Sequence, residues 1–157
     1  MSYTESRRCL LFAGRALTRG HYRRAAGRYA EVVVGLQPQA DVARPLTLEA
    51  VPLVRHYVVA CRGMAAALSQ LEHITPAEEV LLATLSRLRR LISNLSIPAS
   101  GRVLLLTEYK ACFYALVEFY AAHELPERLA AYVQQHAAEL QSWRRDLDLR
   151  AAAQHPN

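Results

Sequence analysis

The chain has few of the features that mark a secreted or membrane-embedded protein. Its 157 residues include three cysteines, Cys9, Cys61 and Cys112, which are odd in number and far apart, so they indicate neither a disulfide framework nor a paired metal site. No segment approaches the roughly 18 consecutive apolar residues that a membrane span needs. The opening MSYTESRR is charged, and no apolar stretch long enough for a secretory signal follows it. We therefore expect no membrane span and a cytoplasmic location, which would be the host cytoplasm if the source is a virus or a pathogen.

Lysine is almost missing, since Lys110 is the only lysine among 19 basic residues. A GC-rich genome is enough to explain that bias, so the positions of the charges carry more information than their type. Residues 1–38 hold seven arginines against Glu5 and Glu31, whereas basic and acidic groups balance in the rest of the chain. The entire net charge of +5 therefore lies near the N-terminus.

The common catalytic and cofactor-binding patterns are also missing. There is no His-x-x-x-His pair, no glycine-rich phosphate loop and no G-x-S-x-G elbow. Cys112 lies among aromatic and aliphatic residues, as a buried, unreactive cysteine would. Arg15 and His21 have the loose spacing of the arginine–histidine pair in ribonucleases of the higher-eukaryote and prokaryote nucleotide-binding type, but Ala16 replaces the usual polar residue. We expect no enzyme, no cofactor and no catalytic or metal site.

Helical periodicity is present along the whole chain, and no segment alternates polar and apolar residues as a strand would. The pattern predicts one all-α domain, residues 1–157, with about six helices in three antiparallel hairpins. The first two expected helices are 2–18 and 21–36. The third begins at 48 or 52 and ends at 72, and the fourth begins at 76 and ends at a break at 97–101. The fifth is 102–123, and the sixth begins at 126 and runs towards the C-terminus. A loop is expected at 37–47, which contains two prolines.

Start signals and burial are predicted for individual helices. Ser2 and Glu5 have the spacing of a capping box, and Thr75 is expected to be an N-cap with Pro76 at the first helical position. Arg55, Arg62 and Ser69 are expected on the solvent side of the third helix. The fifth helix is apolar almost all round, which predicts that it is the central one.

Apolar residues recur at 4-3-4-3 spacing in the fourth and sixth helices, as in a seam between packed helices. The members are Leu81, Leu85, Leu88, Ile92 and Leu95, and then Leu129, Val133, His136, Leu140, Trp143 and Leu147. This is more apolar edge than a small bundle needs, so we expect either self-association or an exposed apolar groove. His136 is a polar residue in a seam, and two interpretations remain open: a satisfied helix–helix contact or a pH-sensitive interface.

The motif Gly20-x-Tyr22-x-x-Ala25-x-x-x-Tyr29 resembles the turn and second helix of a tetratricopeptide repeat. The resemblance covers about residues 8–38. It implies that the glycine makes the helix–helix turn, that the tyrosines fill the hairpin core, and that the alanine allows close helix approach. The expected fold is therefore tetratricopeptide-like or an irregular helical bundle.

The arginines of this hairpin are the candidate partner-binding residues. They are Arg8, Arg15, Arg19, Arg24 and Arg28. Arginine pairs in a planar, bidentate manner with carboxylates and with phosphates, so two functions remain. The first is a non-enzymatic protein–protein interaction module, an adaptor, secretion-type chaperone or assembly factor, that binds an acidic or amphipathic segment. The alternative is a nucleic-acid-associated protein that uses the same arginine face.

One feature favours the protein partner. Bases would stack on aromatic residues beside the arginines, but Tyr22 and Tyr29 fall on the apolar stripe of their helix. Homo-oligomer formation is a further expectation.

Overall fold

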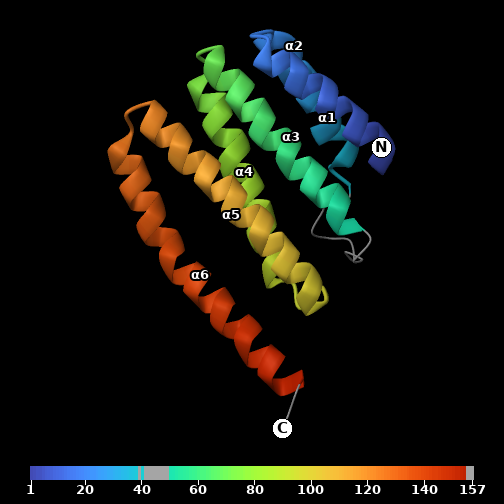
Figure 1. Ribbon diagram of the computed structural model, residues 1–157. Helices are drawn as coiled ribbons and strands as arrows, with labels where there is room; N and C mark the ends of the chain where they lie inside the picture. Colours follow the sequence, from blue (N-terminus) through green and yellow to red (C-terminus); the bar gives the residue numbers. More distant parts are fainter. Residues whose placement is uncertain (39, 41–49, 155–157) are drawn as a thin grey trace.

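The computed structural model describes residues 1–38, 40 and 50–154, apart from the side chains of 140, 144 and 146–154. This part of the chain is all-helical, as predicted, and contains no strand (Figure 1). The helices are α1 (Tyr3–Thr18), α2 (Tyr22–Leu36), α3 (Val51–Gln70), α4 (Ile74–Ser93), α5 (Ala99–Ala122) and α6 (Pro126–Gln154). Most of the loop expected at 37–47 lies outside the described residues.

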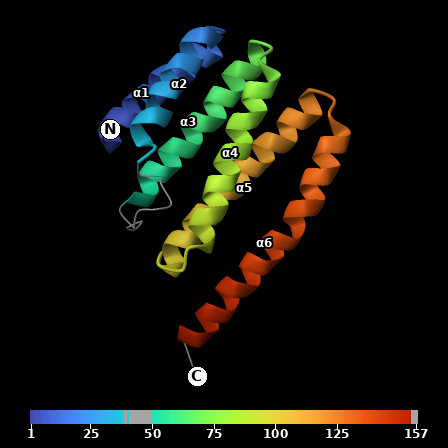
Figure 2. The same cartoon turned by 180° about the vertical axis from the view of Figure 1, so that it is seen from behind.

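Consecutive helices pair as hairpins, α1 with α2, α3 with α4 and α5 with α6, and the hairpins stack in chain order. Figures 1 and 2 show the first hairpin and α6 on opposite sides of the molecule, with α3, α4 and α5 between them. Two bridges connect α3 to α5: Arg55 Nε lies 3.3 Å from Glu108 Oε1, and Ser69 Oγ lies 2.7 Å from His123 Nε2. Arg55 precedes Ser69 on α3, and their partners Glu108 and His123 follow one another in the same order on α5. The two helices therefore run side by side in the same direction.

The three hairpin turns have one backbone conformation. A residue in the left-handed region stands at each turn: Gly20 with φ 74°, Glu72 with φ 61° and Glu124 with φ 53°. The amide of the next residue, His21, His73 or Leu125, donates to the carbonyl five residues earlier in every case. These turns recur at a constant spacing of 52 residues, so the fold is built from three equivalent hairpins.

Helix α3, and not α5, is the central helix. It contacts α1, α2, α4 and α5, whereas the main contacts of α5 are with α3, α4 and α6. Val103, Leu104 and Tyr114 of α5 are each about half exposed or more. The prediction was wrong because α5 belongs to the last hairpin of the stack, where one side of the helix stays uncovered.

Two further details differ from the predictions. Helix α4 begins at Ile74 with His73 as an N-cap that makes no side-chain bond, so Thr75 is not the cap. Pro76 is tolerated at the third helical position because the first amides of a helix have no intrahelical acceptor. Leu95 lies beyond the end of α4 and is 64% exposed, so it is not part of the seam.

The other predicted signals are present in the structure. Ser2 and Glu5 form the capping box at the start of α1. The remaining seam residues of α4 are buried in the core. Small buried residues let the helices approach closely, and Tyr29 of α2 packs directly over Gly63 of α3.

Candidate partner-binding surfaces

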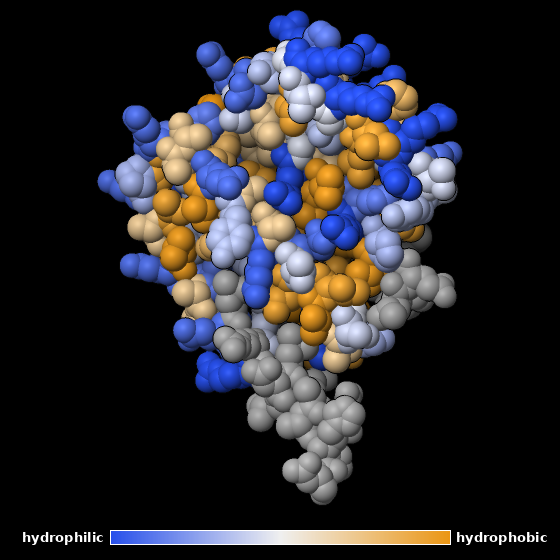
Figure 3. All heavy atoms as spheres, viewed as in Figure 1, coloured by the Kyte–Doolittle hydropathy of each residue, from blue (hydrophilic) through white to orange (hydrophobic). Residues whose placement is uncertain are grey.

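The five predicted arginines all line one hollow between α1 and α2, here called the arginine hollow. It has a volume of about 520 Å³, and its other lining residues are Cys9, Phe12, Ala16 and His21. Arg8, Arg15 and Arg19 follow one another at helical spacing on one side of α1, and Arg24 and Arg28 are one turn apart on α2. Figure 3 shows hydrophilic side chains gathered over this hairpin, at the upper right of the view. The structure therefore brings together residues that the sequence placed on two separate helices.

The positive charge of the arginine hollow is mostly unpaired. Arg28 forms an ion pair with Glu31 at 2.8 Å, and that contact raises the pKa of its guanidinium. Arg8, Arg15, Arg19 and Arg24 have no ion pair within the part of the chain that the structure describes. Four exposed guanidinium groups around one hollow form a surface that attracts anionic groups.

Phe12 is the residue of this surface that the sequence reasoning missed. Its side chain is 53% exposed and lies in the arginine hollow, four residues from Arg8 and three from Arg15. The tyrosines behave as expected, since Tyr29 is buried and Tyr22 is half-buried. Helical spacing alone identifies Phe12, because residues three or four apart share a face.

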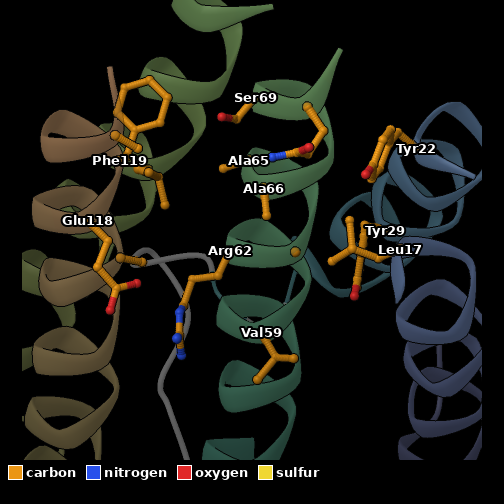
Figure 4. Close-up of a pocket in the computed structure, with 15 residues that line it drawn as sticks. Leu17, Tyr22, Tyr29, Val59, Arg62, Ala65, Ala66, Ser69, Glu118 and Phe119 are labelled. Atoms are coloured by element: carbon orange, nitrogen blue, oxygen red, sulfur yellow. The ribbon is translucent and has the colours of Figure 1, made fainter. Parts of the chain in front are cut away.

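A second hollow, the apolar groove, lies on the face formed by α3 and its neighbours (Figure 4). It has a volume of about 810 Å³. One face of α3 forms the floor, with Val59, Arg62, Gly63, Ala66 and Ser69 at helical spacing. One wall is Leu17, Tyr22 and Tyr29 of the first hairpin, and the other is Ala115, Glu118, Phe119 and Ala122 of α5.

The groove follows from the stacking of the hairpins. The sequence placed Arg62 and Ser69 on the solvent side of α3, and both residues line the groove. That side is hollowed because α5 and the first hairpin rise on either side of α3. The Arg55–Glu108 and Ser69–His123 bridges hold α3 and α5 together at two levels.

Two charged side chains extend into the otherwise apolar groove. Figure 4 shows Arg62 of α3 and Glu118 of α5 reaching into the space between the two helices. The Nε atom of Arg62 is buried and has no hydrogen-bond partner among the described residues. The groove therefore presents one cationic and one anionic group beside its apolar lining.

No metal centre or catalytic cluster emerges from the described residues. They contain no group of three or more His, Cys, Asp or Glu residues placed to hold a metal ion. Arg15 and His21 both line the arginine hollow, together with Ala16 at the position where the ribonuclease pattern has a polar residue. None of the helices, as far as the structure describes them, is long and apolar enough to cross a membrane.

The fold and these surfaces define an all-helical protein of three stacked hairpins, with an arginine hollow on the first hairpin and an apolar groove across α3. Comparison with known protein families, curated proteins and solved structures finds no match to this chain.

Proposed function

We propose that this chain is a non-enzymatic protein–protein interaction module, an adaptor, secretion-type chaperone or assembly factor of the cytoplasm. The supporting observation is the apolar groove of about 810 Å³ along α3, which has small residues on its floor and at least one aromatic side chain in each wall. Grooves of this kind bind the apolar face of an amphipathic helix. Ala66 on the floor is small and exposed, so a partner backbone can approach α3 closely there.

The arginine hollow would act as the long-range electrostatic element of the same module. Its unpaired guanidinium groups attract an acidic segment and increase the association rate, while apolar contacts in the groove supply most of the affinity. The preferred partner is therefore a segment with an apolar face and acidic flanks.

The proposal is tested by placing a photo-crosslinking residue at Ala66 in living cells and identifying the crosslinked segment by mass spectrometry. A peptide with the sequence of that segment is then titrated against the wild type and against Ala66→Trp, which fills the groove. We expect Ala66→Trp to weaken binding at least tenfold. Gly27→Trp is the matched control, because nothing lies within 4 Å of a β-carbon at that exposed position. Equal binding by both variants would contradict the proposal.

The arginines are tested with the same peptide. Reversal of Arg15, Arg19, Arg24 and Arg28 to glutamate should leave the fold intact, since all four side chains are exposed. Binding should weaken and depend only moderately on salt, because apolar contacts carry much of the affinity. If the reversal has no effect, the arginines are solubilising charge.

The alternative function, association with nucleic acid through the arginine hollow, is favoured by one observation, the exposed Phe12 among the arginines. Stacking of a base on an aromatic side chain contributes about 1–3 kcal/mol. Titration with single-stranded oligonucleotides should then give a steep, linear log–log dependence of affinity on salt. Phe12→Ala should weaken binding much more than Leu11→Ala, a control at a neighbouring exposed position. Absence of binding at physiological salt would leave the protein partner as the function.

A further inference from the structure

The side chains of α6 that the structure describes make few fully buried apolar contacts with the rest of the protein. His136 is the one buried side chain of α6 among those that the structure describes, with 1% of its surface exposed. Leu129, Tyr132 and Trp143 are half-buried, and Val133 is 40% exposed. Elements with little buried apolar surface open with the lowest free energies.

Two polar bridges connect α6 to α4. Arg128 of α6 pairs with Glu78 of α4, and the same carboxylate accepts a hydrogen bond of 2.8 Å from the hydroxyl of Tyr120 of α5. Further along, Arg89 Nε of α4 lies 2.9 Å from Glu139 Oε2 of α6. Glu78 and Arg128 of the first bridge and Arg89 of the second line a cleft of about 410 Å³ between α4 and α6.

His136 lies inside the second bridge, and its neutral form fits there. Nη2 of Arg89 lies 2.6 Å from Nδ1 and 3.0 Å from Nε2 of the imidazole, and Glu139 Oε2 lies 3.0 Å from Nδ1. With its proton on Nδ1, a neutral imidazole donates to Glu139 Oε2 and keeps the lone pair of Nε2 to accept from Nη2 of Arg89. An imidazolium has no lone pair, so protonation would set a second positive charge directly against the guanidinium of Arg89.

The surroundings of His136 contain one carboxylate, one guanidinium and two phenols. Glu139 and Tyr132 come from α6, Arg89 from α4, and Tyr109 of α5 faces the same cluster. Burial raises the pKa of both phenols, which keeps them neutral. Burial and Arg89 lower the pKa of His136, and Glu139 opposes this shift only in part.

We propose that α6 is a pH-controlled cover, which docks on α4 and α5 while His136 is neutral and separates from them when His136 binds a proton. Separation would uncover the aromatic side of α5, where Phe113 packs on Tyr132 and Tyr109 packs on Trp143. The uncovered face is distinct from the apolar groove, which lies on the other side of α5, between α5 and the first hairpin.

The direction of the effect follows from linkage. A histidine on a separated α6 titrates at the ordinary value of about 6.5, and its pKa is lower in the docked state. Docking is therefore at full strength above pH 6.5 and weakens as the pH falls below it, until His136 is protonated in the docked state as well. Well below both pKa values, each unit of difference between them increases the ratio of separated to docked protein about tenfold.

Trp143 permits a direct test, because it is the only tryptophan in the chain and its ring packs edge-on against Tyr109 at 5.1 Å. The wavelength of maximum emission of the wild type should move to the red between pH 7.5 and pH 5.5. His136→Gln, which can still donate to Glu139 and accept from Arg89, should show no such shift. His56→Gln is the control: His56 is held by Ser6 at the other end of the stack, and its pKa is also lowered by burial. This control should keep the wild-type response.

Hydrogen exchange provides a second measurement for the case in which His136→Gln is already undocked at pH 7.5. After correction for the intrinsic pH dependence of exchange, wild-type α6 should lose protection several-fold at pH 5.5, while α1, α2 and α3 keep theirs. An unchanged emission maximum in the wild type would overturn the proposal. So would the same shift in His136→Gln, or an equal loss of protection in all six helices.

Discussion

At Gly63, the ring of Tyr29 occupies the space that a β-carbon would need. A β-carbon built there would lie 2.3 Å from Cζ and 2.5 Å from Cε1 of a rigid, buried ring. Gly63→Ala should therefore destabilise the protein by about 1–3 kcal/mol through overpacking, although alanine is the better helix former. Urea denaturation measures the change in the free energy of unfolding.

Gly27→Ala is the matched control for this substitution. Gly27 is exposed on α2, and nothing lies within 4 Å of a β-carbon there. Only the helix-propensity effect remains, so stability should rise by about 0.5–1 kcal/mol. If both variants were stabilised, α2 and α3 would not pack as described.

The cysteines should differ in reactivity according to their burial. Burial raises the pKa of the Cys112 thiol to about 12 and also raises that of Cys61. Because the thiolate is the nucleophile, neither residue should react appreciably with iodoacetamide at pH 8 in the native protein, while the half-buried Cys9 reacts first. Mass spectrometry of tryptic peptides measures this order. All three should react in denaturant, and fast native labelling of Cys112 would show that it is not a core residue.

At the scale of single elements, the hairpin turns carry strain that sequence inspection did not reveal. Glu72 adopts a left-handed conformation in which L-residues other than glycine pay about 1–2 kcal/mol. Glu72→Gly should therefore stabilise the protein, by about 1 kcal/mol. The control is Glu79→Gly in the exposed interior of α4, which should destabilise it by a similar amount. A loss of stability in Glu72→Gly would mean that the turn is not strained in solution.

The helices themselves were largely predictable, because helical periodicity and caps are local. The capping box at Ser2 and the break at Gly20 come from interactions within a few residues, and both are where the sequence placed them. The start of α4 was predicted wrongly because Thr75-Pro76 is a good local signal, whereas the turn conformation at Glu72 and His73 decides where the helix begins.

The equivalence of the three turns was not predictable from composition. Gly20 is recognisable as a turn residue, but Glu72 and Glu124 are not, since glutamate rarely adopts a positive φ. The three hairpins were predicted, but the resemblance to a tetratricopeptide repeat covers only residues 8–38, so the equivalence of the other two turns to the first was not predicted. The resemblance itself stays a prediction.

At the scale of the whole molecule, the stack predicts an order of local stability. Helix α3 contacts four other helices, whereas α6 lies at the end of the stack, and His136 is the one fully buried residue among its described side chains. Hydrogen exchange at pH 7.5 should therefore be slowest for the amides of α3 and fastest for those of α6. Equal protection of α3 and α6 would show that the protein opens only as a single unit.

Self-association also stays a prediction, which sedimentation at micromolar concentration measures.

By itself, the sequence determined the all-helical class, most of the helices, the unusual polar position of His136 and the charge asymmetry. These properties depend on spacing within one helix or on counting charges. Only the tertiary structure decided that α3 is the central helix and that five arginines and Phe12 surround one hollow. It also decided that the solvent side of α3 is the floor of a groove and that Arg89 contacts His136. Each of these depends on how hairpins far apart in the chain stack on one another, and no local pattern specifies that contact.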